Sequence, residues 1–299
     1  MQIATAIQLL TGGLAMGAIY SLVATGLYIT HLATERVNFG QGDFLMAAAF
    51  LTLATRATGM PLIVAICLVV VALGIMGWLL ERIAIRPLDR QRASPIGAYG
   101  WILTTAGVAF ILQNIVELIY GKSSQYSPPL FSDSRDNVLQ VMGVGLVVEE
   151  LLVIVAAVVV VVLFYWFMFR TRWGKSIYAV AFNPEAASLL GISTGNVKIA
   201  VFVIASILAA VAGVLIGPLV TVHPQMGLIF TIKALIVAAV GGFSNPFGIL
   251  IGGLMFGVAE SMSNYADSSF GDLYPLLAAL VIIAIWPSGL FGERARDVR

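Results

Sequence analysis

The sequence predicts an all-α fold, a polytopic helical membrane protein with about eight or nine transmembrane passes. Three observations carry this prediction. The mean hydropathy over the 299 residues is +1.00, and only 10% of the residues are charged, whereas soluble domains carry about 25%. Several apolar runs also reach the roughly 20 residues that a helix needs to cross the hydrocarbon of a bilayer. The net charge of +1 argues against a nucleic-acid-binding protein, which would show a basic excess.

Three of the apolar runs contain no formal charge: 61–80, 151–169 and 199–223. The run 151–169 is rich in Val, but it is too long for a strand, and a lone strand in lipid would leave its backbone groups unpaired. Segments 41–56 and 228–241 are short, so tilted, broken or re-entrant helices are expected there. The remaining candidate spans are 5–30, 100–119, 246–262 and 273–287.

The basic residues predict the orientation, because they favour the cytoplasmic side. Eleven of the sixteen lie in two loops, 81–99 and 170–198, and in the tail: Arg82, Arg86, Arg90, Arg92, Arg170, Arg172, Lys175, Lys198, Arg294, Arg296 and Arg299. Placing them all on one side gives about nine passes, with the N-terminus outside and the C-terminus cytoplasmic. If 41–56 only dips into the membrane, the count is eight and the N-terminus is inside. No Lys or Arg precedes Arg36, so 5–30 is interpreted as a retained span.

Small residues predict close packing of these helices in a single domain over residues 1–299. Two glycines four residues apart lie on one helix face and let two backbones approach. This spacing occurs at Gly13/Gly17, Gly213/Gly217, Gly248/Gly252 and Gly253/Gly257.

Residues 183–191, inside the loop 170–198, predict a short capped helix outside the membrane. Asn183 suits the N-cap, Pro184 suits the first helical position, and Glu185 complements the positive helix end. Gly191 is placed for the C′ position. Helix-forming residues fill the interior: Ala186, Ala187, Leu189 and Leu190. Such a helix can sit in a groove of a soluble partner; the alternative is a surface connector with no partner.

The residues Glu185-Ala186-Ala187 followed by Gly191 resemble the EAA loop of bacterial ABC-importer permeases. Other stretches, in family order, resemble the high-affinity branched-chain amino acid permease family: 38–44, 81–88, 172–176 and 240–242. The resemblance covers nearly the whole chain. It implies a permease subunit that moves a branched-chain or other hydrophobic amino acid from periplasm to cytoplasm by alternating access. Residues 183–191 would be the cytoplasmic coupling helix that docks on an ATPase.

The same resemblance implies partners and a location. The partners are a second homologous permease subunit, as a heterodimer, two ATP-binding subunits and a periplasmic substrate-binding protein, and the location is the bacterial inner membrane. ATP and Mg²⁺ are expected on the ATPase chains, because this sequence has no Gly-xxxx-Gly-Lys-Ser/Thr loop. No catalytic constellation and no metal site is expected, so the chain is interpreted as a transport subunit and not an enzyme.

Two alternatives stay open on substrate and mechanism. Permeases of this family also serve urea, short amides and aromatic acids. An ion-coupled secondary transporter is less favoured, because it would need acidic residues deep within spans, and the long central runs contain none.

Candidate pathway residues are polar groups and glycines near the membrane. Asn38, Gln41 and Asp43 follow the first span; either they face the pathway from a broken helix, or they cap helix ends at the interface. Lys233 interrupts an apolar run and either snorkels to the outer interface or meets a substrate carboxylate. Gly241 and Gly242 mark irregular backbone, which in transporters lies beside a cavity. Two further acidic residues near predicted span ends are interpreted as paired structural groups: Glu117 and Glu260.

Overall fold

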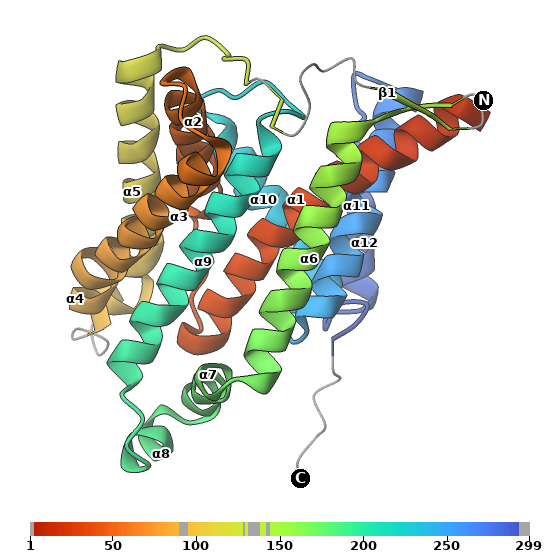
Figure 1. Cartoon of the computed structure of the whole chain (residues 1–299). Helices are drawn as coiled ribbons and strands as arrows, with labels where there is room; N and C mark the ends of the chain where they lie inside the picture. Colours follow the sequence, from red (N-terminus) through yellow and green to blue (C-terminus); the bar gives the residue numbers. More distant parts are fainter. Residues whose placement is uncertain (1–2, 90–94, 128, 131–137, 142–143, 293–299) are drawn as a thin grey trace.

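The computed structural model describes residues 3–89, 95–127, 129–130, 138–141 and 144–292, which form a bundle of helices with one short hairpin (Figure 1). Its elements are α1 (Ile3–Thr34), α2 (Gln41–Ala57), α3 (Leu62–Leu79), the π-helix η1 (Leu80–Ile85), α4 (Arg86–Asp89), α5 (Pro95–Tyr120), β1 (Val138–Val141), β2 (Val144–Val147), α6 (Val148–Arg170), α7 (Arg172–Phe182), α8 (Pro184–Leu189), α9 (Thr194–Ile216), α10 (Met226–Gly241), α11 (Pro246–Ala266) and α12 (Leu273–Ile285).

The prediction of a polytopic helical membrane protein is confirmed. Among the described residues, 6 helices are long and apolar enough to cross a membrane, and α10 and α12 are shorter apolar helices. Each of the nine predicted spans coincides with a helix, α2 included. One boundary is wrong: the predicted span 199–223 continues past the end of α9 at Ile216. The sequence Gly217-Pro218 ends the helix there, because proline lacks a donor and disfavours helical backbone at the residue before it.

Helices α1, α9 and α11 form the centre of the bundle. In the spanning window of α9, 67% of the residues are buried inside the protein, against 17% in α5, which lies at the edge in Figure 1. Helix α1 packs on α6, α9, α10 and α11. The glycine pairs make the closest of these contacts: a Cβ on Gly13 would lie 2.8 Å from Gly257 O, and one on Gly17 would overlap Gly253 O. The predicted role of these pairs in packing is therefore observed between α1 and α11.

A short hairpin, which the all-helical prediction did not include, lies beside the N-terminal end of α1. Strands β1 and β2 pair antiparallel, with Val138 opposite Val147. Gln8 Nε2 of α1 donates to Gly145 O at 2.9 Å. A helix of 32 residues is about 48 Å long and exceeds the hydrocarbon thickness of roughly 30 Å, so the first turns of α1 and the hairpin extend beyond the bundle together.

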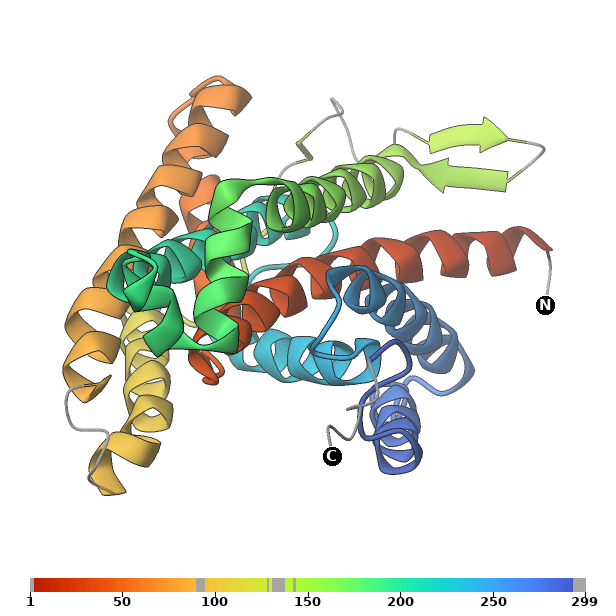
Figure 2. The ribbon, with the colours of Figure 1, turned by 90° about the horizontal axis from the view of Figure 1, so that it is seen from below.

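The two ends of the bundle differ in the elements that they carry. The hairpin and the start of α1 lie at the upper end of Figure 1, and α7 and α8 lie at the lower end. Seen from below in Figure 2, α7 and α8 lie across the ends of the long helices. Five basic residues used for the orientation lie outside the described residues: Arg90, Arg92, Arg294, Arg296 and Arg299.

Candidate functional site

Helix α8 has the capped form that its sequence predicts. Asn183 is the N-cap, and its Oδ1 accepts a hydrogen bond from the backbone N–H of Ala186 at 2.9 Å. Pro184 occupies the first turn. After the C-cap at Leu190, Gly191 has φ +82°, the left-handed conformation that glycine adopts without steric cost. Residues 183–191 therefore form a rigid, locally encoded unit.

The side chains of α8 and its neighbours divide into an inward and an outward set. Ala187 faces inward and is 2% exposed, whereas Leu189 is 89% and Leu190 81% exposed. Phe182, at the end of α7, is 95% exposed. Large apolar side chains that project from the end of a membrane bundle have no lipid tail to contact, so this group is suited to a groove in another protein.

Helix α7 connects α8 to the centre of the bundle. Thr171 caps it, accepting from Gly174 N at 3.1 Å, and α7 packs on α1, α6, α8 and α9. Tyr178 of α7 shares a hydrogen bond with Tyr28 of α1, with the two hydroxyl oxygens 3.0 Å apart. Burial raises the pKa of Tyr178 above its ordinary value, so this phenol stays protonated at neutral pH. The contact thus joins the end of the bundle to its central helix.

The polar residues at the start of α2 lie inside the bundle. Asn38 is 2% exposed and Gln41 is fully buried. Asn38 Oδ1 accepts from Gly40 N at 3.1 Å, and Gln41 Nε2 donates to Ala205 O at 2.8 Å. Because Ala205 lies in the middle of α9, α2 begins at mid-bundle. The capping that the second alternative expected is observed for Asn38, and contact of these residues with a pathway stays a prediction.

Asp43 lies where α2 meets the start of α10. Its Oδ1 accepts from Gln113 Nε2 of α5 at 2.8 Å, and Gly227 of α10 is so close that a Cβ there would overlap the carboxylate. Gly42 N donates to Thr231 Oγ1 of α10 at 2.8 Å. The sequence analysis did not identify these partners. The available signal was their spacing: Gly227 and Thr231 are four residues apart, as are Gln113 and Glu117, so each pair lies on one helix face.

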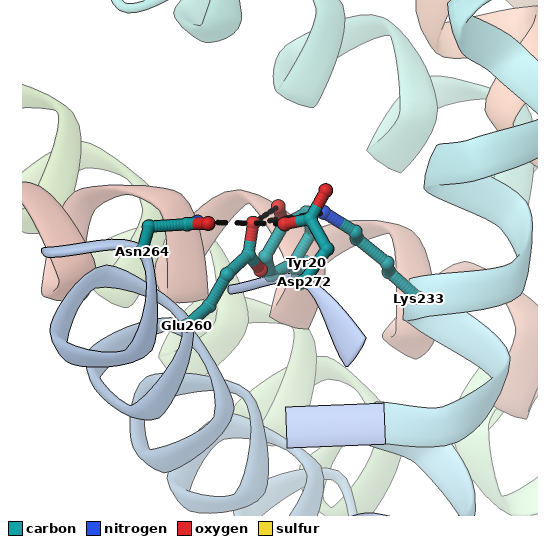
Figure 3. A network of polar contacts seen from close by, with 5 residues as sticks. All are labelled: Tyr20, Lys233, Glu260, Asn264 and Asp272. Atoms are coloured by element: carbon teal, nitrogen blue, oxygen red, sulfur yellow. Dashed lines mark hydrogen bonds and ion pairs between the residues drawn. The ribbon is translucent and has the colours of Figure 1, made fainter. Parts of the chain in front are cut away.

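Lys233 lies on another side of α10, inside a network of charges (Figure 3). It is 8% exposed, and its Nζ lies 2.8 Å from Glu260 Oε1 and 3.3 Å from Asp272 Oδ1. Tyr20 donates to the same Glu260 oxygen at 3.0 Å, and Asn264 donates to Asp272 at 3.4 Å. Lys233 therefore has a buried acidic partner and an exposed one, and its contact with a substrate carboxylate stays a prediction.

The other sequence candidates occupy separate places. Glu260 and Glu117 are paired as expected, since Glu117 lies 3.2 Å from Lys122 Nζ. Gly241 ends α10 and Gly242, with φ +87°, caps it. Both are packed against backbone: a Cβ on Gly241 would lie 2.6 Å from Ile249 Cα. Gly227, the residue of α10 that contacts Asp43, is fourteen residues, about 21 Å along a helix, from Gly241, so the structure does not bring Gly241 and Gly242 together with Asp43.

These features define a class of protein: a polytopic helical membrane protein with half-length helices that begin inside the bundle and an exposed capped helix at one end. Residues 9–286 match the family described as branched-chain amino acid transport system / permease component. The chain belongs to this family and is a transport subunit.

Relatives match over almost their full length. The chain is 28% identical to the high-affinity branched-chain amino acid transport system permease protein LivH of Salmonella typhimurium over 303 residues, 96% of each chain. It is also 28% identical to the permease protein BraD of Pseudomonas aeruginosa, again over 96% of each. Among solved structures, PsaBC from Streptococcus pneumoniae in complex with Fab superposes with a TM-score of 0.50 over 93% of this chain and 89% of that one, at 13% identity. That similarity concerns the fold alone.

Proposed function

We propose that this chain is the permease subunit of an ATP-driven importer, which moves a branched-chain or other hydrophobic amino acid across the bacterial inner membrane by alternating access. The observation that carries the proposal is α8, a capped helix with exposed leucines at one end of a membrane bundle of this family. The names of the relatives, branched-chain amino acid permeases, support the substrate class over urea, short amides and aromatic acids.

The partners in this proposal are a second homologous permease, two ATP-binding subunits that hold ATP and Mg²⁺, and a periplasmic substrate-binding protein. The end of the bundle that carries α7 and α8 is assigned to the cytoplasm, with the C-terminus. Basic residues support this assignment, because positive charge favours the cytoplasmic side and Arg170, Arg172 and Lys175 lie at the end of α6 and in α7.

Motion of the ATPases reaches the bundle through α8 and α7. An ATPase that grips Leu189 and Leu190 moves α8, which packs on α7 and α9. Tyr178 then carries a displacement of α7 to Tyr28, near the C-terminal end of α1. Packed helices move as rigid bodies between discrete arrangements, so a docking event at α8 can reorient the helices that surround the pathway.

Reconstitution tests the proposal. The chain is purified with its co-expressed partners and placed in proteoliposomes, and uptake of radiolabelled leucine, urea and benzoate is measured with ATP inside and with an ion gradient alone. Leucine uptake that requires ATP is expected. Uptake that runs on the ion gradient without ATP would instead identify a secondary transporter.

Replacing Leu190 by aspartate is expected to separate the permease from its ATPases. A charge in the centre of an apolar contact costs about 2 kcal/mol or more, which lowers ATPase co-purification and ATP-driven uptake at least about tenfold. Membrane insertion should not change, because this side chain is 81% exposed outside the spans.

Leu139→Asp is the matched control for Leu190→Asp, because Leu139 is 50% exposed on β1, at the opposite end of the bundle. It should leave ATPase co-purification unchanged. Equal co-purification of the ATPase with both variants would show that α8 is not part of the docking surface.

A further inference from the structure

Asp43 is a buried carboxylate that its surroundings leave incompletely bonded. It is 1% exposed, and Gln113 Nε2 donates to its Oδ1. Its Oδ2 has no hydrogen-bond partner in the part of the chain that the structure describes. A carboxylate in a membrane protein interior is costly unless donors surround it, so an incompletely bonded one by default indicates a function.

Two helix starts meet at Asp43 and offset part of the cost of burying its charge. It lies in the first turn of α2 and beside Gly227, in the first turn of α10. The starts of both helices carry partial positive charge. The side chain that donates to this carboxylate, Gln113, is a neutral amide. An ionised Asp43 would therefore have partial positive charges and one amide donor beside it.

The helix that supplies Gln113 is the least embedded of the long helices. Only 17% of the spanning window of α5 is buried, and α5 packs on α2, α4 and η1. Two polar pairs, one helical turn apart, hold it to the starts of the half-length helices: Gln113 to Asp43 at 2.8 Å, and Glu117 to Gln225 at 3.0 Å. A displacement of α5 would therefore uncover Asp43 from one side.

We propose that Asp43 binds the ammonium group of the transported solute when α5 is displaced, and that Gln113 occupies this position when no solute is present. This inference rests on the proposed import function. An ammonium group brings three donors and a full positive charge, so it can donate to both Oδ1 and Oδ2 of Asp43. The Gln113 amide donates to Oδ1. Urea and simple amides would leave the carboxylate without a counter-charge, so Asp43 favours amino acids over neutral solutes.

The surroundings also suit the apolar part of such a solute. On α5, Ala109 and Val116 lie one turn before and one turn after Gln113, and they are 6% and 8% exposed. Phe44, next to Asp43 in α2, is 1% exposed. The Asp43 carboxylate thus has buried apolar residues next to it in α2 and next to its donor in α5, which suits a site for a small amphipathic ligand.

The test compares variants of the complete reconstituted complex, with leucine as the probe. Asp43→Asn is expected to lower maximal leucine uptake at least about tenfold, because it removes the counter-charge of the ammonium group. Asp43→Glu, which keeps the charge, should retain uptake within about threefold. Asp267→Asn, in the turn between α11 and α12, is the matched control and should transport normally.

The Gln113→Leu variant distinguishes a binding role of Asp43 from a structural one. Its result can be interpreted even if the Asp43→Asn variant does not fold. If Gln113 competes with the solute for Asp43, its removal leaves leucine uptake equal to the wild type or higher. Leucine uptake by Asp43→Asn within twofold of the wild type, or a Gln113→Leu defect as large as that of Asp43→Asn, would overturn the proposal. Absence of ATP-driven uptake of any probe by the wild-type complex would refute the import function itself, which is a different result.

Discussion

Replacing Lys233 by methionine is expected to destabilise the folded bundle by about 3–5 kcal/mol, the cost of breaking a buried ion pair. The substitution removes the cation that lies 2.8 Å from Glu260 and leaves this carboxylate with the Tyr20 hydroxyl as a donor, while both side chains of the pair are 11% exposed. The contact with Asp272 adds little, because that side chain is 64% exposed and water screens it. Thermal and SDS-induced unfolding in detergent measure the effect.

Two further variants make the Lys233 result specific. Lys175→Met, on the exposed surface of α7, should change the unfolding free energy by less than about 0.5 kcal/mol. The double variant Lys233→Met/Glu260→Gln removes both charges and should recover a large part of the loss, because the cost arises from the unpaired carboxylate. A Lys233→Met protein as stable as the Lys175→Met control would show that the network contributes no stability.

The sequence predicted α8 well because its signals are local. The cap of Asn183, the position of Pro184 and the turn at Gly191 all act within nine residues of chain, and the structure has each where these rules place it. The apolar spans were predicted for a related reason: hydrocarbon thickness sets their length, whatever their neighbours.

The pairing of polar groups could not be predicted in the same way. Lys233 and Glu260 are 27 residues apart, and Asp43 and Gln113 are 70 apart. Each contact depends on which faces of two helices pack together, and a single sequence does not contain that information. For Lys233 the sequence therefore left two alternatives, the outer interface or a substrate carboxylate, and did not predict its pairing with Glu260. The Gly-xxx-Gly spacing likewise predicts a packing face without identifying the helix that it contacts.

Replacing Gly257 by leucine is expected to prevent α1 and α11 from packing, with a loss of about 3 kcal/mol or more, since overpacking is most costly where backbone atoms oppose the new side chain. A Cβ at Gly257 would overlap the carbonyl oxygen of Gly13 and the backbone of Gly17. Neither can rotate away as a flexible side chain would. The reciprocal contact of Gly17 with Gly253 O means that the two helices would have to separate along several turns.

Gly107→Leu provides the control for this substitution, because Gly107 lies in α5 and a Cβ there would meet nothing within 4 Å. It exchanges the same two residue types in a helix of the same protein, so a difference between the variants reports packing and not helix propensity. Folded yield in detergent and the unfolding midpoint are the measurements. Because α1 also contacts α7 through Tyr28 and Tyr178, a Gly257→Leu protein that does assemble should transmit ATPase docking poorly. Equal stability of the two variants would contradict the close α1–α11 contact from which this prediction follows.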